Sequence, residues 1–378
     1  MDFELGEEES LLRDTVRGLC DQRVRPEAGA WDEVRALPDG LLSELGEMGL
    51  LAMEIAEDAG GAGLSAVAAT ALCEELASAD GALAQVIAAH NHLGLAHVAA
   101  KASEAMRESE LPALVGGEHV VAWALPEHAR AGGESDLGIV ARRDGDDWIL
   151  EGRVPHVLGA SLAGRVVVFA DTNAGPGAWM FDVGTDGVGI EPTRTLGARA
   201  AGIGHVALQA VRVPDGQRLG EPGAALVDAR GLLVRHDIAC AAVACGLARG
   251  ALQVSAAYAQ EREQFGRPIA RFQAIQWKLA DMGTTLDAAW LLTMKAAWRR
   301  DAGRPEDEVA RAAARARAYA GPMATRACSE ALQIHGGYGY TREYPVERAL
   351  RDARQHEGRG GSAMRLRLAD AIAQRFAG

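Results

Sequence analysis

Residues 238–260 are rich in alanine and apolar on nearly every side of a helix. A helix without a polar face has to be covered all round, so this segment predicts the central helix of a bundle. Helical patterns at about 269–299, 306–334 and 362–376 supply the helices that cover it. Pro322 lies inside one of them and is expected to kink it. The C-terminal part of the chain is therefore predicted to be a helical bundle.

The first 118 residues also follow a helical pattern. The Gly-Gly-Ala-Gly tract at 60–63 is expected to separate two helical segments, because glycine breaks helices. Two amphipathic stripes stand before it, formed by Leu11, Leu12, Val16 and Leu19, and by Leu41, Leu42, Leu45, Met48 and Leu51.

The middle of the chain follows a different pattern. Between 119 and 222, short runs rich in β-formers predict strands at 120–123, 148–150, 166–169 and 206–208. Asp144, Gly145 and Asp146 read as a hairpin turn. We therefore expect three parts: an N-terminal helical domain at 1–118, a β domain at 119–222 and a C-terminal helical bundle at 223–378.

Composition narrows the class of partner. The formal net charge of −13 argues against nucleic acid or an anionic membrane as a main partner, although local arginine clusters can still bind phosphate. The five cysteines are scattered, without the spacing of a metal site. The acidic start is unlike a signal peptide, and no apolar run is judged long enough to span a membrane. These features favour a cytoplasmic protein with no metal.

Two segments of the bundle are specific enough to indicate a family. One is Arg-Glu-Gln-Phe-Gly-Arg-Pro at 262–268, and the other is Gln-Ile-His-Gly-Gly-Tyr-Gly-Tyr at 333–340, followed by Arg-Asp-Ala at 351–353. Alone, the first is a helix that ends at a glycine cap before proline. Together they resemble the FAD-site signature of acyl-CoA dehydrogenases, and the resemblance covers nearly the whole chain. It implies a mainly α fold with a central β domain: an N-terminal helical domain, a small β-barrel and a C-terminal four-helix bundle.

The resemblance also implies which residues hold the cofactor. In that family, the matching positions bind the pyrophosphate and adenosine of a neighbouring subunit's FAD; here they are Arg262, Phe265, Gln333, Gly336 and Gly337. The chemistry is suitable, because a guanidinium pairs with phosphate and glycines let backbone N–H groups approach it. Ser362 stands where the family has a threonine, at the start of the last predicted helix, whose N-terminus favours phosphate.

The flavin-ring side departs from the family pattern. Where the family has Thr-Glu-Pro and then Gly-Ser-Asp, this chain has Pro126 at the threonine position and Ser135 in the second motif. Pro126 lacks both the hydroxyl and the N–H that can bond the flavin edge. The aromatic residue that covers the ring is His156, with Leu158 in place of the neighbouring threonine. These changes predict altered or weakened binding of the flavin ring.

The catalytic carboxylate is missing from both of its recognised positions. The usual glutamate aligns with Gly360, and the alternative glutamate used by one branch aligns with His236, followed by Asp237 in place of arginine. Three possibilities follow. Glu357 serves as the base if the loop is shortened; His236 or Asp237 serves from the other helix; or the chain has no dehydrogenase base. The ordinary alternative for residues 235–237 is a polar helix turn with an internal ion pair.

Three functions therefore stay open. The first is an FAD-dependent dehydrogenase in fatty acid metabolism that desaturates an acyl-CoA or acyl-carrier-protein thioester with an atypical base. The second is a non-catalytic half-site subunit of a heterotetramer, and the third is a flavin-dependent oxygenase or oxidase. A homotetramer or heterotetramer is implied by the family. His90 and His92 resemble a family stretch near the substrate tunnel, but at i and i+2 they do not share a helix face.

Overall fold

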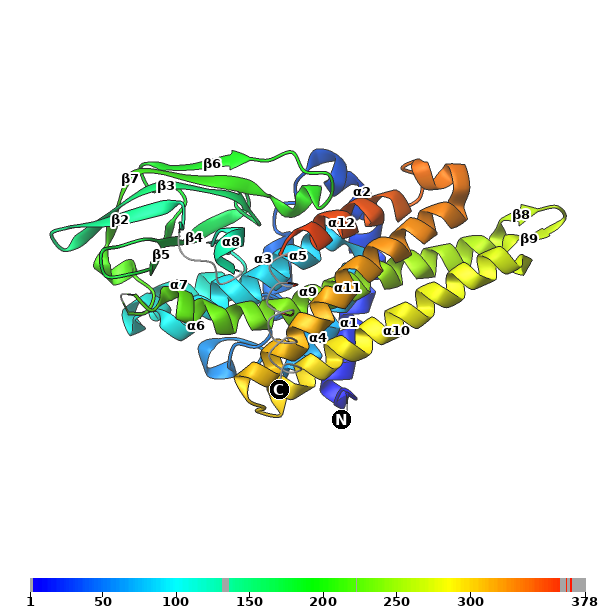
Figure 1. Cartoon of the computed structure of the whole chain (residues 1–378), viewed down its shortest axis with the longest axis horizontal. Helices are drawn as coiled ribbons and strands as arrows, with labels where there is room; N and C mark the ends of the chain where they lie inside the picture. Colours follow the sequence, from blue (N-terminus) through cyan, green and yellow to red (C-terminus); the bar gives the residue numbers. More distant parts are fainter. Residues whose placement is uncertain (1–2, 131–135, 222, 361–364, 366–367, 369–378) are drawn as a thin grey trace.

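The computed structural model of the chain describes residues 3–130, 136–221 and 223–360, together with 365 and 368. Helices come first, a β domain follows, and long helices come last, as the sequence predicts (Figure 1). The β domain lies at one end of the longest axis, and the small hairpin β8–β9 lies at the other end. The predicted helix at 362–376 falls largely outside the described residues.

In the described part of the chain, seven α-helices precede the first strand. They are α1 Glu7–Leu19, α2 Arg25–Val34, α3 Leu41–Glu47, α4 Ala66–Ala79, α5 Gly81–Ala89, α6 Ala96–Lys101 and α7 Glu104–Val115. Every residue of α4 and α5 is buried. Ser65 and Asp80 begin these two helices, because their side-chain oxygens accept the N–H groups of Ala68 (3.1 Å) and Leu83 (2.8 Å).

The β domain consists of two sheets around a shared apolar core. In one sheet the order is β1-β4-β5, with β1 and β4 parallel; in the other it is β2-β3-β7-β6, all antiparallel. A single bridge from Val140 to Asp171 joins β2 to the end of β4. The hairpin turn at Gly145 and all four predicted strands are confirmed. The strand bounds are β1 Val120–Ala124, β2 Ile139–Asp144, β3 Asp147–Val157, β4 Ala163–Ala170, β5 Gly177–Asp182, β6 Val188–Pro192 and β7 Gly204–Pro214, and the short helix α8 spans Glu127–Arg130.

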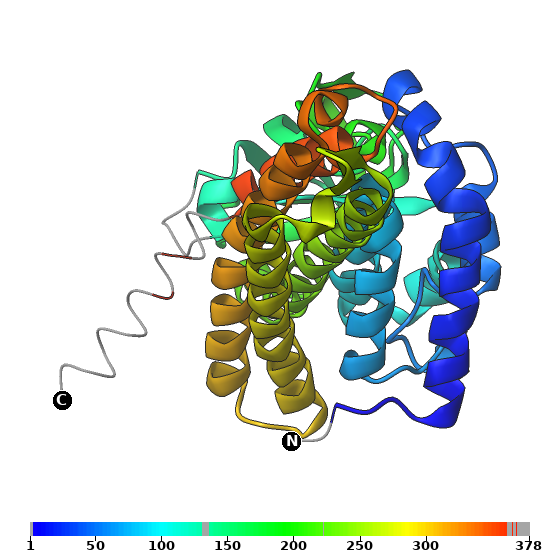
Figure 2. The ribbon, with the colours of Figure 1, turned by 90° about the vertical axis from the view of Figure 1, so that its right-hand side faces the viewer.

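The C-terminal bundle is built around α9, which spans Ala225–Glu261. Its partners are α10 Gln273–Asp301, α11 Glu306–His335 and α12 Val346–Gly358 (Figure 2). The predicted helices at 238–260, 269–299 and 306–334 are thus confirmed, and α11 is assigned as one helix through Pro322. By length and composition α9 is apolar enough to cross a membrane, so the expectation that no segment reaches that length was wrong. Most of that apolar stretch is buried among the other helices, as in the core of a bundle.

Helix α9 approaches α4 through two glycines. A Cβ at Gly246 would collide with the carbonyl oxygen of Glu74, and one at Gly250 would collide with that of Ser78. The two backbones meet where side chains are absent, which is how small residues permit close helix contact. This contact fixes the N-terminal helices against the bundle.

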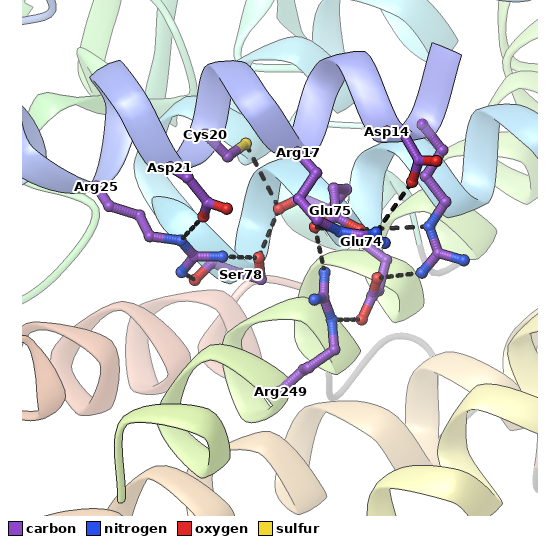
Figure 3. A network of polar contacts seen from close by, with 10 residues as sticks. Asp14, Arg17, Cys20, Asp21, Arg25, Glu74, Glu75, Ser78 and Arg249 are labelled. Carbon is purple, nitrogen blue, oxygen red and sulfur yellow. Dashed lines mark hydrogen bonds and ion pairs between the residues drawn. The ribbon is translucent and has the colours of Figure 1, made fainter. Parts of the chain in front are cut away.

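A buried network of charges reinforces the same contact (Figure 3). The carboxylate of Glu75 on α4 has no exposed surface and lies within 3.2–3.3 Å of guanidinium nitrogens of Arg13, Arg17 and Arg249. Arg249 also pairs with Glu74. Burial by itself raises the pKa of Glu75, but hydrogen bonds and charge from Arg17 and Arg249 outweigh it and hold that pKa below its usual range.

Candidate active site

The hairpin between α9 and α10 presents an aromatic side chain to solvent. Its strands are β8 Glu263–Gln264 and β9 Arg267–Pro268, joined by a two-residue turn in which Phe265 (φ 53°) and Gly266 (φ 76°) are left-handed. Turns of this kind match the twist of two antiparallel strands. Phe265 is 94 % exposed at the tip. The sequence analysis did not predict the strands, because two-residue strands carry no periodicity.

A cavity of about 480 Å³ lies between the base of this hairpin and the turn after α11. Arg262, Gly336 and Gly337 line it, and the Arg262 guanidinium stands 5.7 Å from the centre of the Tyr338 ring. Gly336 has φ 58° and ψ −131°, a conformation suited to glycine, and no atom lies within 4 Å of a Cβ built on either glycine. Open backbone, a cation and aromatic rings fit a phosphate attached to a flat ring system.

One further feature belongs to this cavity, and another lies close to it in the sequence. The Nε2 atom of His335 is buried and has no hydrogen-bond partner among the described residues, and His335 lines the cavity. Gln333 is exposed on the last turn of α11. The structure therefore gathers Arg262, Gly336 and Gly337 at one cavity and leaves Phe265 and Gln333 exposed to solvent.

The predicted flavin-ring residues Pro126 and His156 belong to the β domain and not to the hairpin end of the bundle (Figure 1). Pro126 is buried just after β1. His156 is exposed at an irregularity of β3, with φ 54° and its ring centre 5.1 Å from that of His205. The carbonyl oxygen of His156 accepts a hydrogen bond from Arg359 (3.0 Å), so the β domain meets the end of α12 here. Ser135 and Ser362 lie outside the described residues.

A guanidinium stands beside Gly360, the residue predicted to align with the family's usual base. Gly360 has φ 78°, and a Cβ built on it would lie 3.0 Å from Cζ of Arg317 and closer still to Nη2. Arg317, on α11, donates to the carboxylate of Asp237 and to the carbonyl oxygen of Arg359. Burial alone lowers the pKa of Arg317, but Cys240 and the Asp237 carboxylate outweigh it and raise that pKa above its ordinary value. A fixed positive charge therefore stands beside residue 360.

The sequence analysis missed Arg317. Its partners Asp237 and Arg359 are 80 and 42 residues away along the chain. Several other arginines occur in the same Ala-rich helix, so nothing in the local pattern singles this one out. The ion pair between Asp237 and Arg317 joins α9 to α11. The sequence analysis had considered an ion pair within the helix turn at 235–237 instead.

Glu357 and Arg317 face one cavity of about 260 Å³. The Glu357 carboxylate accepts a hydrogen bond from the Thr325 hydroxyl (2.6 Å) and lies 3.6 Å from Arg354 and 3.9 Å from Arg365. Cys240, His356, Arg354 and Arg365 also line this cavity.

The histidines beside this cavity have defined partners. His356 donates through Nε2 to the carbonyl oxygen of Cys240 (2.7 Å), and burial lowers the pKa of His356 to about 4, so it is neutral near pH 7. Both ring nitrogens of His236 lie 3.6 Å from the Cys240 sulfur. The structure thus brings Asp237 and Gly360 together through Arg317, and it places Glu357 on the same cavity.

His90 and Asn91 connect buried segments. His90 accepts the Val121 N–H (3.1 Å) and donates to the Leu114 carbonyl (3.1 Å), while the Asn91 side chain bonds Met53 and Leu50. Within the part of the chain that the structure describes, no group of three or more His, Cys, Asp and Glu residues is arranged to hold a metal ion.

Comparison with known proteins identifies the class of this fold and site. Residues 6–118 match the acyl-CoA dehydrogenase N-terminal domain, and residues 229–374 match the C-terminal domain of the same family. The probable acyl-CoA dehydrogenase YngJ of Bacillus subtilis is 35 % identical over 96 % of this chain and 97 % of its own. The chain therefore belongs to the acyl-CoA dehydrogenase family of oxidoreductases.

Solved structures agree. The butyryl-CoA dehydrogenase of Megasphaera elsdenii has a TM-score of 0.91 and 29 % identity, over 98 % of this chain and 100 % of its own. A glutaryl-CoA dehydrogenase of Mycobacterium smegmatis in complex with FADH2 has a TM-score of 0.89 and 27 % identity, over 98 % of this chain and 95 % of its own. The family and the fold class that the sequence predicts are both confirmed.

Proposed function

We propose that this chain is an FAD-dependent acyl-thioester dehydrogenase that completes its cofactor site only in an oligomer. The observation that carries this proposal is the separation of the two predicted halves of the FAD site. Arg262 and Phe265 belong to the hairpin between α9 and α10, whereas Pro126 and His156 belong to the β domain, and Figure 1 shows the hairpin projecting away from that domain. The hairpin points away from the β domain of its own copy, so we infer that a second copy supplies one of the two halves. The minimal unit is a dimer, and a homotetramer is the form we expect.

The residues at the hairpin end suit the nucleotide half of FAD. Arg262 supplies a cation for the pyrophosphate, and Gly336 and Gly337 leave open backbone beside it. Phe265 offers a ring on which a base can stack, and Gln333 adds an exposed amide. In the β domain, His156 and Pro126 would lie beside the flavin ring. When FAD is bound, this ring accepts hydride from the β-carbon of the substrate. The relative solved with FADH2 supports this choice of cofactor.

The base that we propose is Glu357. Its carboxylate faces the same cavity as Arg317, and the Thr325 hydroxyl fixes one of its oxygens. Glu357 takes the α-proton of the thioester, while Arg317 supplies positive charge beside the position where relatives carry their glutamate. No carboxylate is needed at Gly360 in this arrangement.

A glutamine substitution tests the base. Glu357→Gln keeps the shape of the side chain and the bond from Thr325 but cannot accept a proton, so exchange of the α-hydrogen of butyryl-CoA with deuterated solvent should fall at least about 100-fold, with FAD still bound. Glu347→Gln is the matched control, because Glu347 lies on the same helix with similar side-chain exposure, 22 % against 24 %, and its partner is Arg351. Undiminished exchange in Glu357→Gln, with loss in Asp237→Asn, would move the base to Asp237.

One observation favours a second function. Because Arg317 fills the space beside Gly360, the chain also suits a non-catalytic subunit that donates Arg262 and Phe265 to a partner dehydrogenase. The two functions differ under anaerobic conditions. A dehydrogenase purified alone is bleached in the visible flavin band by an acyl-CoA from a short-to-long panel. A half-site subunit is not bleached until a related subunit with an intact glutamate is added.

A further inference from the structure

The cavity next to Gly360 is positively charged although the protein as a whole is acidic. Its lining holds three arginines and one glutamate, Arg317, Arg354, Arg365 and Glu357, whereas the whole chain carries a formal net charge of −13. His356, the remaining titratable nitrogen group of the lining, is neutral near pH 7 because burial lowers its pKa to about 4. Asp237 lies behind Arg317 and offsets one of the positive charges.

Arg317 is held so that it can recognise a flat anion. Its side chain is 10 % exposed, and its position is fixed by the Asp237 carboxylate, which is 3 % exposed, and by the Arg359 carbonyl. These two bonds use two of the five N–H donors of a guanidinium. A guanidinium that is fixed and shielded from water binds a carboxylate more strongly than a mobile surface arginine does.

The volume of the cavity limits what it can take. About 260 Å³ corresponds to eight or nine waters at roughly 30 Å³ each, which suits a group of up to about nine heavy atoms. Its apolar lining is short, consisting of Ala318, Gly321, Pro322 and Gly358. Size and charge together describe a small anionic group.

We propose that this cavity binds a carboxylate carried by the acyl group of the thioester substrate, and that Arg317 is the residue that recognises it. The preferred substrates are then short acyl thioesters with a second, free carboxyl group. This inference rests on the proposed function, because it places the acyl group of a thioester beside Gly360. It deepens that function by assigning the substrate class.

The test compares two acyl groups of equal length by calorimetry. Full-length protein loaded with FAD is titrated with succinyl-CoA and with butyryl-CoA, which both carry four-carbon acyl groups and differ in the terminal carboxylate. A charge-assisted hydrogen bond in a shielded site corresponds to about a 10- to 100-fold tighter Kd for succinyl-CoA. Free succinate is titrated as well, to separate recognition of the acyl group from binding of any small dianion.

A paired substitution then removes the cation without leaving its partner charged. Arg317→Gln combined with Asp237→Asn replaces the ion pair by two amides, which avoids an unpaired buried charge. The matched control is Arg311→Gln combined with Asp307→Asn, an Arg–Asp pair on the surface of the same helix α11. The preference for succinyl-CoA should disappear in the first variant and persist in the second.

Several results would overturn the proposal. In the wild type, these are equal affinities for succinyl-CoA and butyryl-CoA, no binding of either thioester, or binding of free succinate as tight as that of succinyl-CoA. In the paired variant Arg317→Gln with Asp237→Asn, it is a preference for succinyl-CoA that persists. The wild-type comparison decides even if the paired variant does not fold. Tight binding of succinyl-CoA without bleaching of FAD would support this inference while counting against the dehydrogenase. Bleaching of FAD by butyryl-CoA, without tighter binding of succinyl-CoA, would support the dehydrogenase and overturn this inference.

Discussion

Two glycines at the end of α12 should respond in opposite ways to a single methyl group. Gly360 is left-handed (φ 78°), and its missing Cβ leaves room for Arg317, whereas a Cβ on Gly358 would meet no atom within 4 Å. Gly360→Ala costs roughly 1–2 kcal/mol for the left-handed backbone. It also displaces Nη2 of Arg317 from the Arg359 carbonyl, which costs about 1.5–3 kcal/mol.

The sum, about 2.5–5 kcal/mol, converts into a shift of melting temperature. An unfolding entropy of about 2.1 cal/mol/K per residue over 378 residues gives about 0.8 kcal/mol per kelvin. Gly360→Ala should therefore lower the Tm by about 3–6 °C. Gly358→Ala, in the last turn of a helix, should raise it by about 1 °C, because alanine is favoured over glycine there by roughly 0.5–1 kcal/mol.

Calorimetric scans of the two variants beside the wild type, at one protein concentration and one FAD concentration, decide the matter. If Gly360→Ala melts within 1 °C of the wild type, Arg317 does not occupy the space beside residue 360. Arg317 could then not supply positive charge beside Gly360.

Three further outcomes are expected. Glu75→Gln removes the centre of a buried charge network and should cost about 3–5 kcal/mol in urea unfolding; Asp14→Asn, at an exposed ion pair, should cost less than about 0.5 kcal/mol, and equal costs would refute the role of the network. Phe265→Ala should weaken FAD binding by about 1–3 kcal/mol without lowering the Tm of the FAD-free protein. The control Leu11→Ala, at a likewise exposed side chain, should leave FAD affinity unchanged. Unchanged FAD affinity in Phe265→Ala would contradict the placement of the nucleotide. Burial lowers the pKa of four histidines to about 4, namely His90, His92, His97 and His356. As pH falls from 6.5 towards 4, the free energy of unfolding should drop by about 1.4 kcal/mol per pH unit for each of them, because the unfolded state binds more protons. Urea titrations at pH 7, 6 and 5 that give the same free energy of unfolding would contradict these lowered pKa values.

The long helices and the β-runs could be predicted because their periodicity is local. The apolar stretch at 238–260 indicates α9, although the helix begins earlier, at Ala225. Residues 225–237 include charged side chains such as Asp228 and Arg235, which conceal the apolar pattern there. The turn at Gly145 was predicted from three residues, since turn chemistry is also local.

The candidate site could be predicted only in part. Arg262, Gly336 and Gly337 come from motifs, and the structure gathers them at one cavity. The guanidinium of Arg317 beside Gly360 depends on contacts between residues far apart in sequence, which no periodicity reveals. Counting along the chain predicts that the glutamate is missing, and only the fold shows which side chain lies beside Gly360.

The central claim is that one FAD is shared between two copies of this chain. The most direct measurement is the ratio of FAD to chain in protein purified alone, taken from the visible spectrum, together with the molar mass of the same sample by light scattering. The account predicts about one FAD per chain in an oligomer of two or more copies, with no FAD on any monomer. A monomer that retains FAD, or an oligomer that binds almost none, would contradict it.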